Sequence, residues 1–211
     1  MDHRTAHDAH PTGSTSTMAL AATLHCLTGC AIGEVLGLMV GTALGLGTVA
    51  TIALAIALAF LFGYALSTLP LLRAGLGLRA ALVVVLAADT LSIATMELVD
   101  NLVMALIPGA MEAGLVNPVF WLSMMLALTI AFFAAWPVNR YLLSRGKGHA
   151  LTHDYRGSTP TGSRRFIPAL ATSTLVAAIT AFMLGGLVVS IADDLETSPT
   201  TSHSLGVPST P

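Results

Sequence analysis

The strongest constraint in this sequence is the recurrence of long apolar stretches with almost no charge. Residues 18–72 contain no lysine or arginine, and Glu34 is their one acidic residue. In the whole chain 55% of the residues are apolar and 9% are charged, whereas soluble domains carry about 25% charged residues. A stretch of about 20 apolar residues spans the hydrocarbon core of a bilayer as an α-helix. The sequence therefore predicts an all-α integral membrane protein whose surroundings are the lipid bilayer.

Glycine, proline and charged residues divide the apolar sequence into about five expected transmembrane helices. Gly45, Pro70 and Pro108 mark turns, because Gly and Pro interrupt or end helices. Trp121 and Tyr141 lie near opposite ends of the fourth apolar stretch, as interfacial aromatic residues do. We expect a transmembrane domain over residues 18–192, with spans at residues 18–42, 48–69, 79–107, 118–142 and 166–191.

The two ends of the chain are polar. Residues 1–17 contain His3, His7 and His10 among small polar residues, and we expect a flexible tail there. Residues 193–211 are acidic and rich in Ser, Thr and Pro, which predicts a disordered tail. Neither tail is expected to contribute to the membrane domain.

The basic residues predict the orientation of the chain. All of them except Arg4 fall within residues 70–79 and 140–165. Basic loops are retained in the cytoplasm, and an odd number of spans puts both stretches on the side of the N-terminus. We therefore expect a cytoplasmic N-terminus, an outside C-terminus and a location in the bacterial inner (cytoplasmic) membrane.

Acidic residues within the spans are the strongest functional signal. Glu34, Asp89 and Glu97 lie inside expected spans, and Asp100 lies nearer the end of the third span. A charged carboxylate at the bilayer centre costs at least about 2.5–3.5 kcal/mol, so such residues are functional candidates by default. Since the spans contain no Lys or Arg near these carboxylates, protons or a bound cation must neutralise their negative charge. The simpler alternative is a protonated carboxyl group in a helix contact.

The first span carries two cysteines and a carboxylate on one face. Cys26, Cys30 and Glu34 follow at intervals of four residues, and His25 precedes them. Thiolate and imidazole groups bind Cu(I), Zn(II) or Fe, although a buried cysteine can also be an inert small residue. Glycine occupies every fourth position beside this face, which allows a second helix to approach closely. That face is also a possible homo-oligomer contact and comprises Gly29, Gly33, Gly37 and Gly41.

The third span carries a second polar face, and we expect the two faces to meet. At about 1.5 Å per residue, Cys30 and Asp89 should lie at similar depth. The result is a predicted seam of sulfur and carboxylate groups, with methionines toward the outside. The face of the third span comprises Asp89, Ser92, Met96 and Asp100, with Glu97 at its edge. The methionines expected toward the outside are Met39, Met96, Met124 and Met125, which can equally be packing residues.

Several runs of residues resemble a known family. They are His25–Glu34, Ala88–Ile93, Met96-Glu97, Asp100-Asn101, Pro108–Met111, Pro137–Arg140 and Gly146–Ala150. In these runs the chain is similar to a bacterial membrane family catalogued as domain of unknown function 4396. The resemblance covers about residues 22–151 and implies a shared membrane fold, but it brings no established activity. The functional prediction therefore rests on ligand chemistry.

The ligand set favours binding or transport of a transition-metal cation, with copper preferred over zinc or iron. The candidate metal ligands are His25, Cys26, Cys30, Glu34, Asp89, Met96, Glu97 and Asp100. Two other functions remain open. One is a membrane thiol oxidoreductase that uses Cys26 and Cys30 with a quinone or haem. The other is a proton-coupled carrier of another solute, in which the carboxylates relay protons.

Other classes of function are not indicated. A net charge of −2 with no basic run argues against a nucleic-acid partner. No nucleophile elbow, phosphate-binding loop or zinc-protease helix motif occurs, so we assign no catalytic residue and do not predict an enzyme.

Overall fold

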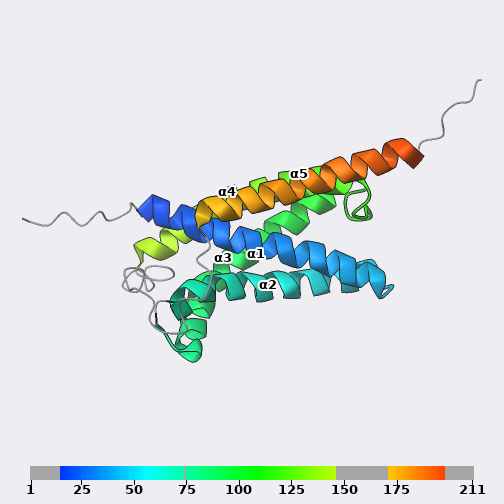
Figure 1. Cartoon of the computed structure of the whole chain (residues 1–211). Helices are drawn as coiled ribbons and strands as arrows, with labels where there is room; N and C mark the ends of the chain where they lie inside the picture. The colour runs from blue at the N-terminus through cyan, green and yellow to red at the C-terminus, as the bar shows by residue number, and fades with distance from the viewer. Residues whose placement is uncertain (1–14, 74, 146–170, 198–211) are drawn as a thin grey trace, which may run out of the picture.

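Five helices make up the part of the chain that the computed structural model describes, residues 15–73, 75–145 and 171–197 (Figure 1). They are α1 (Thr15–Ala43), α2 (Thr48–Arg73), α3 (Leu78–Leu106), α4 (Pro118–Ser144) and α5 (Thr172–Thr197). No strand occurs within these ranges, and the predicted all-α fold is confirmed.

The length and apolarity of these helices confirm a multi-pass membrane protein. In the described ranges α1, α2, α4 and α5 are each long and apolar enough to cross a bilayer. α3 makes a fifth span if Leu78–Ala87 and Asp89–Leu106, which meet at a bend of 51°, are taken together. Beside the bend the Thr90 hydroxyl donates to the carbonyl of Leu86, and hydrogen bonds of this kind often bend a helix.

Some helix ends differ from the expected ones. Pro70 lies inside α2 instead of ending it, because membrane helices tolerate proline where neighbouring groups replace the lost hydrogen bond. α1 begins at Thr15, three residues inside the expected N-terminal tail. α5 continues through Asp193 to Thr197, whose hydroxyl donates to the Asp193 carbonyl, so this part of the expected tail is helical. Residues 1–14, 166–170 and 198–211 of the expected segments lie outside the described residues.

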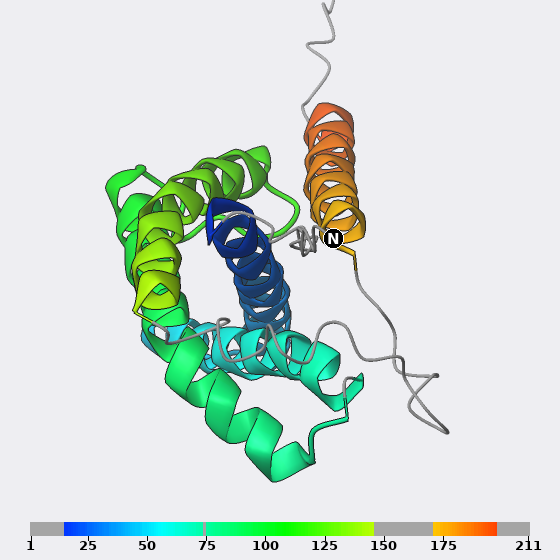
Figure 2. The same cartoon turned by 90° about the vertical axis from the view of Figure 1, so that its left-hand side faces the viewer.

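α1 is the central helix and packs against all four others (Figure 2). It approaches α2 closely through the predicted glycine face. A Cβ atom on Gly33 would lie 2.2 Å from the backbone nitrogen of Ala59, so only glycine permits this contact. In the same way Gly29 meets Gly63, Gly37 meets Ala55 and Gly41 meets Thr51.

The predicted close approach of a second helix is therefore confirmed, and that helix belongs to the same chain. Because α2 fills the glycine face, this face cannot also be the expected contact between two copies. Self-association through another surface stays a prediction.

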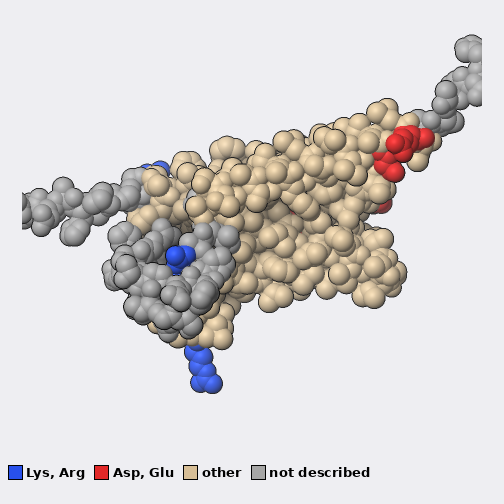
Figure 3. Space-filling view, viewed as in Figure 1, with Lys and Arg blue, Asp and Glu red and all other residues tan. Residues whose placement is uncertain are grey.

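The two ends of the helix bundle carry opposite charge. The start of α1, the α2–α3 turn and the end of α4 lie at one end, and the α1–α2 turn and the end of α5 lie at the other (Figure 1). Figure 3 shows Lys and Arg at the first end and Asp and Glu at the second. The described basic residues at the first end, here called the basic end, are Arg73, Arg79, Arg140 and Arg145. The positive-inside rule predicts that this end is cytoplasmic.

α5 packs against α1 and α4, and Trp121 is central to this contact. Its ring contacts Phe182 edge-on at a centroid distance of 5.6 Å and covers Gly186, where a Cβ atom would lie 2.4 Å from the ring. The indole nitrogen donates to the Leu115 carbonyl at 2.7 Å. Trp121 is thus a buried packing residue in the first turn of α4, and its expected position in the membrane interface stays a prediction.

Candidate functional site

α1 and α3 direct their polar faces into the bundle. On α1 the side chains of Cys26, Cys30 and Glu34 are all buried. On α3 the buried members are Asp89, Ser92, Met96, Glu97 and Asp100. His25 is the one candidate ligand outside this buried set, because it is half-buried and its Nδ1 hydrogen-bonds with the carbonyl of Ala21 at 2.7 Å.

Three acidic side chains gather in what we call the carboxylate cluster, formed by Glu34, Glu97 and Asp100. They lie close enough to interact electrostatically, and the thiol of Cys30 interacts with both glutamates. As charged carboxylates, Glu34, Glu97 and Oδ1 of Asp100 accept no hydrogen bond from the described residues, whereas a bound proton would link Glu34 with Asp100, and Glu97 lies beside the Cys30 thiol. Burying polar oxygens without partners is costly, so this cluster calls for a bound proton or cation.

The second cysteine lies in a separate group nearer the basic end. The Cys26 thiol interacts electrostatically with Asp89, and the hydroxyl groups of Ser67 and Ser92 flank it. The sequence predicted Asp89 at the depth of Cys30, whereas the Asp89 carboxylate interacts with the thiol of Cys26, which lies one turn earlier in α1. The depth count assumed a straight helix, whereas the first part of α3 is bent away and covers less depth.

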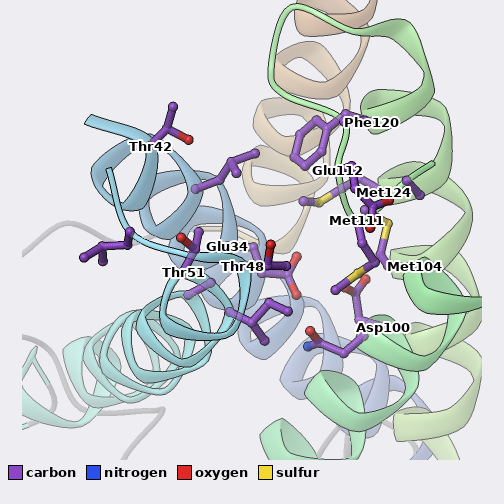
Figure 4. Close-up of a pocket in the computed structure, with 17 residues that line it drawn as sticks. Glu34, Thr42, Thr48, Thr51, Asp100, Met104, Met111, Glu112, Phe120 and Met124 are labelled. Atoms are coloured by element: carbon purple, nitrogen blue, oxygen red, sulfur yellow. The ribbon is translucent and has the colours of Figure 1, made fainter. Parts of the chain in front are cut away.

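A cavity of about 320 Å³ connects the carboxylate cluster with the surface opposite the basic end (Figure 4). Leu46, Thr48 and Glu112 form its exposed rim, in the α1–α2 turn, the start of α2 and the α3–α4 connection. Glu34 and Asp100 lie deeper, with exposed fractions of 7% and 4%, and Figure 4 shows them projecting into the cavity. A solute or ion entering from this end would therefore meet two buried carboxylates.

Three methionines line the same cavity. They are Met104 at the end of α3, Met111 in the α3–α4 connection and Met124 in α4. Figure 4 shows all three on the α3–α4 side, near Asp100 and Glu112. A methionine layer on the outer side of the carboxylates was predicted, but its composition differs.

Of the methionines expected there, only Met124 lines the cavity. Met39 is 50% exposed on the outside of the bundle, and Met125 lines a separate apolar groove between α4, α1 and α5. Met96 is fully buried within the helix core. Helix periodicity places a side chain on a face, but it does not say which faces enclose a cavity.

Among the described residues, no group of three or more His, Cys, Asp and Glu side chains is arranged to hold a metal ion. The predicted ligands are therefore divided into the Cys26–Asp89 group and the carboxylate cluster with Cys30, and His25 is apart from both. They do not form one preassembled site.

Sequence reasoning missed Met104, Met111 and Asn139. Met104 follows Asp100 by four residues, so the helical period could have identified it. Met111 lies in a connection, where no period applies. Asn139 directly precedes Arg140 in the sequence, and it is buried, with its amide donating to the hydroxyl of Thr23 on α1 at 2.8 Å.

Comparison with known proteins identifies one family. A family model described as a domain of unknown function, DUF4396, matches residues 15–148. This range contains α1 to α4, the carboxylate cluster and the cavity, and it excludes α5. No curated protein and no solved structure matches the chain. With its match over more than half of the sequence, the chain belongs to the DUF4396 family.

Proposed function

We propose that this protein binds a transition-metal cation and carries it through the membrane, by way of the cavity and the seam between α1 and α3. The position of the Glu34 side chain is the main support for this proposal. This side chain is buried and projects into the cavity, and its neighbour Asp100 is a second acid, which can share a hydrogen bond with it only through a bound proton.

Charge compensation supports a cationic cargo. Glu34, Glu97 and Asp100 lie together in a region of low dielectric, and the described arginines lie at the opposite end of the bundle. Buried like charges are unfavourable unless protons or cations neutralise them. A metal ion would replace protons on these oxygens and satisfy them.

Sulfur beside the carboxylates supports a transition metal over an alkali or alkaline-earth ion. Cys30 adjoins the carboxylate cluster, and methionine thioethers line the cavity above it. Mg(II) and Ca(II) prefer oxygen ligands alone, whereas thiolate and thioether ligands favour Cu(I) and other soft ions. Copper is therefore the preferred cargo.

The divided arrangement of the ligands favours a carrier over a storage site. A transported ion must bind well enough to enter and weakly enough to leave, often at several positions in turn. The carboxylate cluster and the Cys26–Asp89 group lie one after the other along the bundle, which provides two such positions. A closed set of four ligands would instead retain the ion.

Uptake by proteoliposomes tests this proposal. We expect Glu34→Gln and Asp100→Asn each to reduce metal uptake more than tenfold, because each keeps the side-chain shape and removes the negative charge. Uptake of Cu(I) and Zn(II) would be measured by elemental analysis of the vesicles. Glu196→Gln, on the exposed last turn of α5, is the matched control and should transport like the unmodified protein.

Normal metal uptake by a folded Glu34→Gln variant would contradict the proposal. A thermal unfolding curve for each variant in detergent shows whether lost uptake reflects lost structure.

A proton-coupled carrier of another solute is the second candidate, and the cavity volume favours it. About 320 Å³ accommodates a small organic molecule as well as an ion. In that case Glu34 and Glu97 would relay protons and the sulfur atoms would be incidental. Cys30→Ser would then leave transport unchanged, and the purified protein would contain no metal, whereas Glu34→Gln would abolish transport.

The third possibility, a thiol oxidoreductase, receives less support from the geometry. Cys26 and Cys30 are free thiols with exposed fractions of 0% and 1%. Thiol–disulfide exchange needs direct access of a partner to the sulfur atom. A thiol count before and after treatment with a quinone would detect this activity as the loss of two thiols.

A further inference from the structure

We propose that Met104, Met111 and Met124 form a thioether site for Cu(I) at the mouth of the cavity. This inference rests on the proposed function and names the ion that enters: a soft monovalent cation binds first to the methionines and then passes to the carboxylate cluster. We call these three residues the methionine site.

The three side chains come from three separate segments of the chain. Met104 is in the last turn of α3, Met111 follows in the connection, and Met124 is in the second turn of α4. Met104 and Met124 are buried and Met111 is half-buried, and all three line the cavity. The fold therefore brings three thioethers to one wall, which Figure 4 shows beside Asp100.

The surroundings of the methionine site distinguish it from ordinary packing. Methionine usually fills gaps between apolar side chains. Here the three thioethers line a cavity whose inner wall holds Glu34, which is more than nine-tenths buried, points into the cavity and has the acids Glu97 and Asp100 as its electrostatic neighbours. Buried acids that share a cavity with thioethers favour a cation between them.

The chemistry of the two layers is complementary. Thioethers are neutral and soft, so they select Cu(I) over Zn(II) without holding it by charge. Carboxylates supply negative charge but little selectivity for soft ions. The methionine site thus selects the ion first. The ion then passes to Glu34 and Asp100, which lie deeper and neutralise its charge.

Metal binding by the full-length protein tests this inference. The variant carries Met104→Leu, Met111→Leu and Met124→Leu, which nearly conserve side-chain volume and remove the sulfur. The probes are Ag(I), a soft monovalent ion with the preferences of Cu(I), and Zn(II), each measured by equilibrium dialysis and elemental analysis. We expect the affinity for Ag(I) to fall at least tenfold and the affinity for Zn(II) to change less than twofold.

A matched control replaces three methionines outside the cavity. Met39→Leu, Met125→Leu and Met183→Leu alter one exposed residue and two residues of the apolar groove. This variant should bind both ions as the unmodified protein does. If the cavity variant does not fold, Met111→Leu alone, at a half-buried position in a connection, should still weaken Ag(I) binding and leave Zn(II) binding unchanged.

Two results would overturn the inference: unchanged Ag(I) affinity in the cavity variant, or an equal loss for Ag(I) and Zn(II). Its failure is distinguishable from failure of the proposed function. If Glu34→Gln lowers metal uptake while the methionine variants bind Ag(I) normally, the inference alone is wrong. If the methionine variants lose Ag(I) while Glu34→Gln transports normally, the carboxylate route is wrong.

Discussion

At the scale of single residues, the interior of this bundle contains two kinds of polar group. The Asn139 amide on α4 donates to the Thr23 hydroxyl on α1, and that hydroxyl donates to the Ala19 carbonyl. Glu34 accepts no hydrogen bond from a neutral or cationic side chain among the described residues, lies beside the acids Glu97 and Asp100, and faces a cavity. A satisfied polar pair holds helices together, whereas an unsatisfied carboxylate is free to bind a ligand. One helix, α1, thus carries both a polar residue that joins two helices and the carboxylate to which the proposed function assigns the cation.

The hydrogen bond between Asn139 and Thr23 predicts a measurable coupling between α1 and α4. We expect Thr23→Val and Asn139→Leu each to lower the free energy of unfolding by about 0.5–2 kcal/mol. Their double variant should show a coupling energy of about 0.6 kcal/mol, the average for polar contacts between membrane helices. Unfolding in mixed detergent micelles measures all three values.

Thr129→Val is the control, because the Thr129 hydroxyl is exposed and donates only within α4, to the Met125 carbonyl. Strictly additive effects of Thr23→Val and Asn139→Leu would show that the two side chains do not interact.

At the scale of helices, the α1–α2 pair supports the candidate site. Glycine on α1 lets α2 pack against one face, and this leaves the cysteine and glutamate face toward α3. The small residues thus determine which side of α1 is available for chemistry. Loss of the close contact would rotate or displace Glu34 relative to the cavity.

Replacing one glycine tests this contact. Gly33→Ala should destabilise the protein by about 1–3 kcal/mol, because the new methyl group would overlap the backbone of α2 at Ala59. Gly185→Ala on α5 is the matched control, since a Cβ atom there has no heavy atom within 4 Å. Thermal unfolding in detergent compares the two. Equal stability of both variants would contradict the close packing described for α1 and α2.

The helices were largely predictable from the sequence, and the registry between them was not. Apolar length and the positions of Gly and Pro located the helices, because the bilayer demands continuous apolar segments. The 51° bend in α3 is not marked by a proline in the sequence, so it could not be predicted. Beyond this bend, Asp89 lies beside Cys26 and not beside Cys30. The cavity also depends on the α3–α4 connection, in which Met111 has no periodic signature.

At the scale of the whole molecule, charge and cavity define a direction. The described arginines lie at one end, and the cavity opens at the other, beside the α1–α2 turn and the α3–α4 connection. The positive-inside rule then predicts that the cavity faces outward. With this orientation, the proposed function predicts that the ion enters from the outside and is released toward the cytoplasm.

Chemical labelling tests this orientation. We expect Val116→Cys, exposed in the α3–α4 connection, to react with a membrane-impermeant maleimide in intact cells. Ser144→Cys, exposed at the end of α4, should react only after the membrane is permeabilised. Both would be placed in a chain whose two native cysteines are alanine. The opposite labelling pattern would reverse the orientation and the direction of transport.

The proposed function and the methionine site both require a cation in the cavity, between the carboxylate cluster and the three thioethers. Anomalous diffraction from crystals of the full-length protein saturated with Ag(I) tests it most directly, because it locates the ion itself. We expect an anomalous peak in contact with the Glu34 carboxylate or the Met104 sulfur, and its absence in Glu34→Gln combined with Met104→Leu. Metal-saturated crystals with no peak in this cavity, or with peaks only at surface residues, would contradict the account.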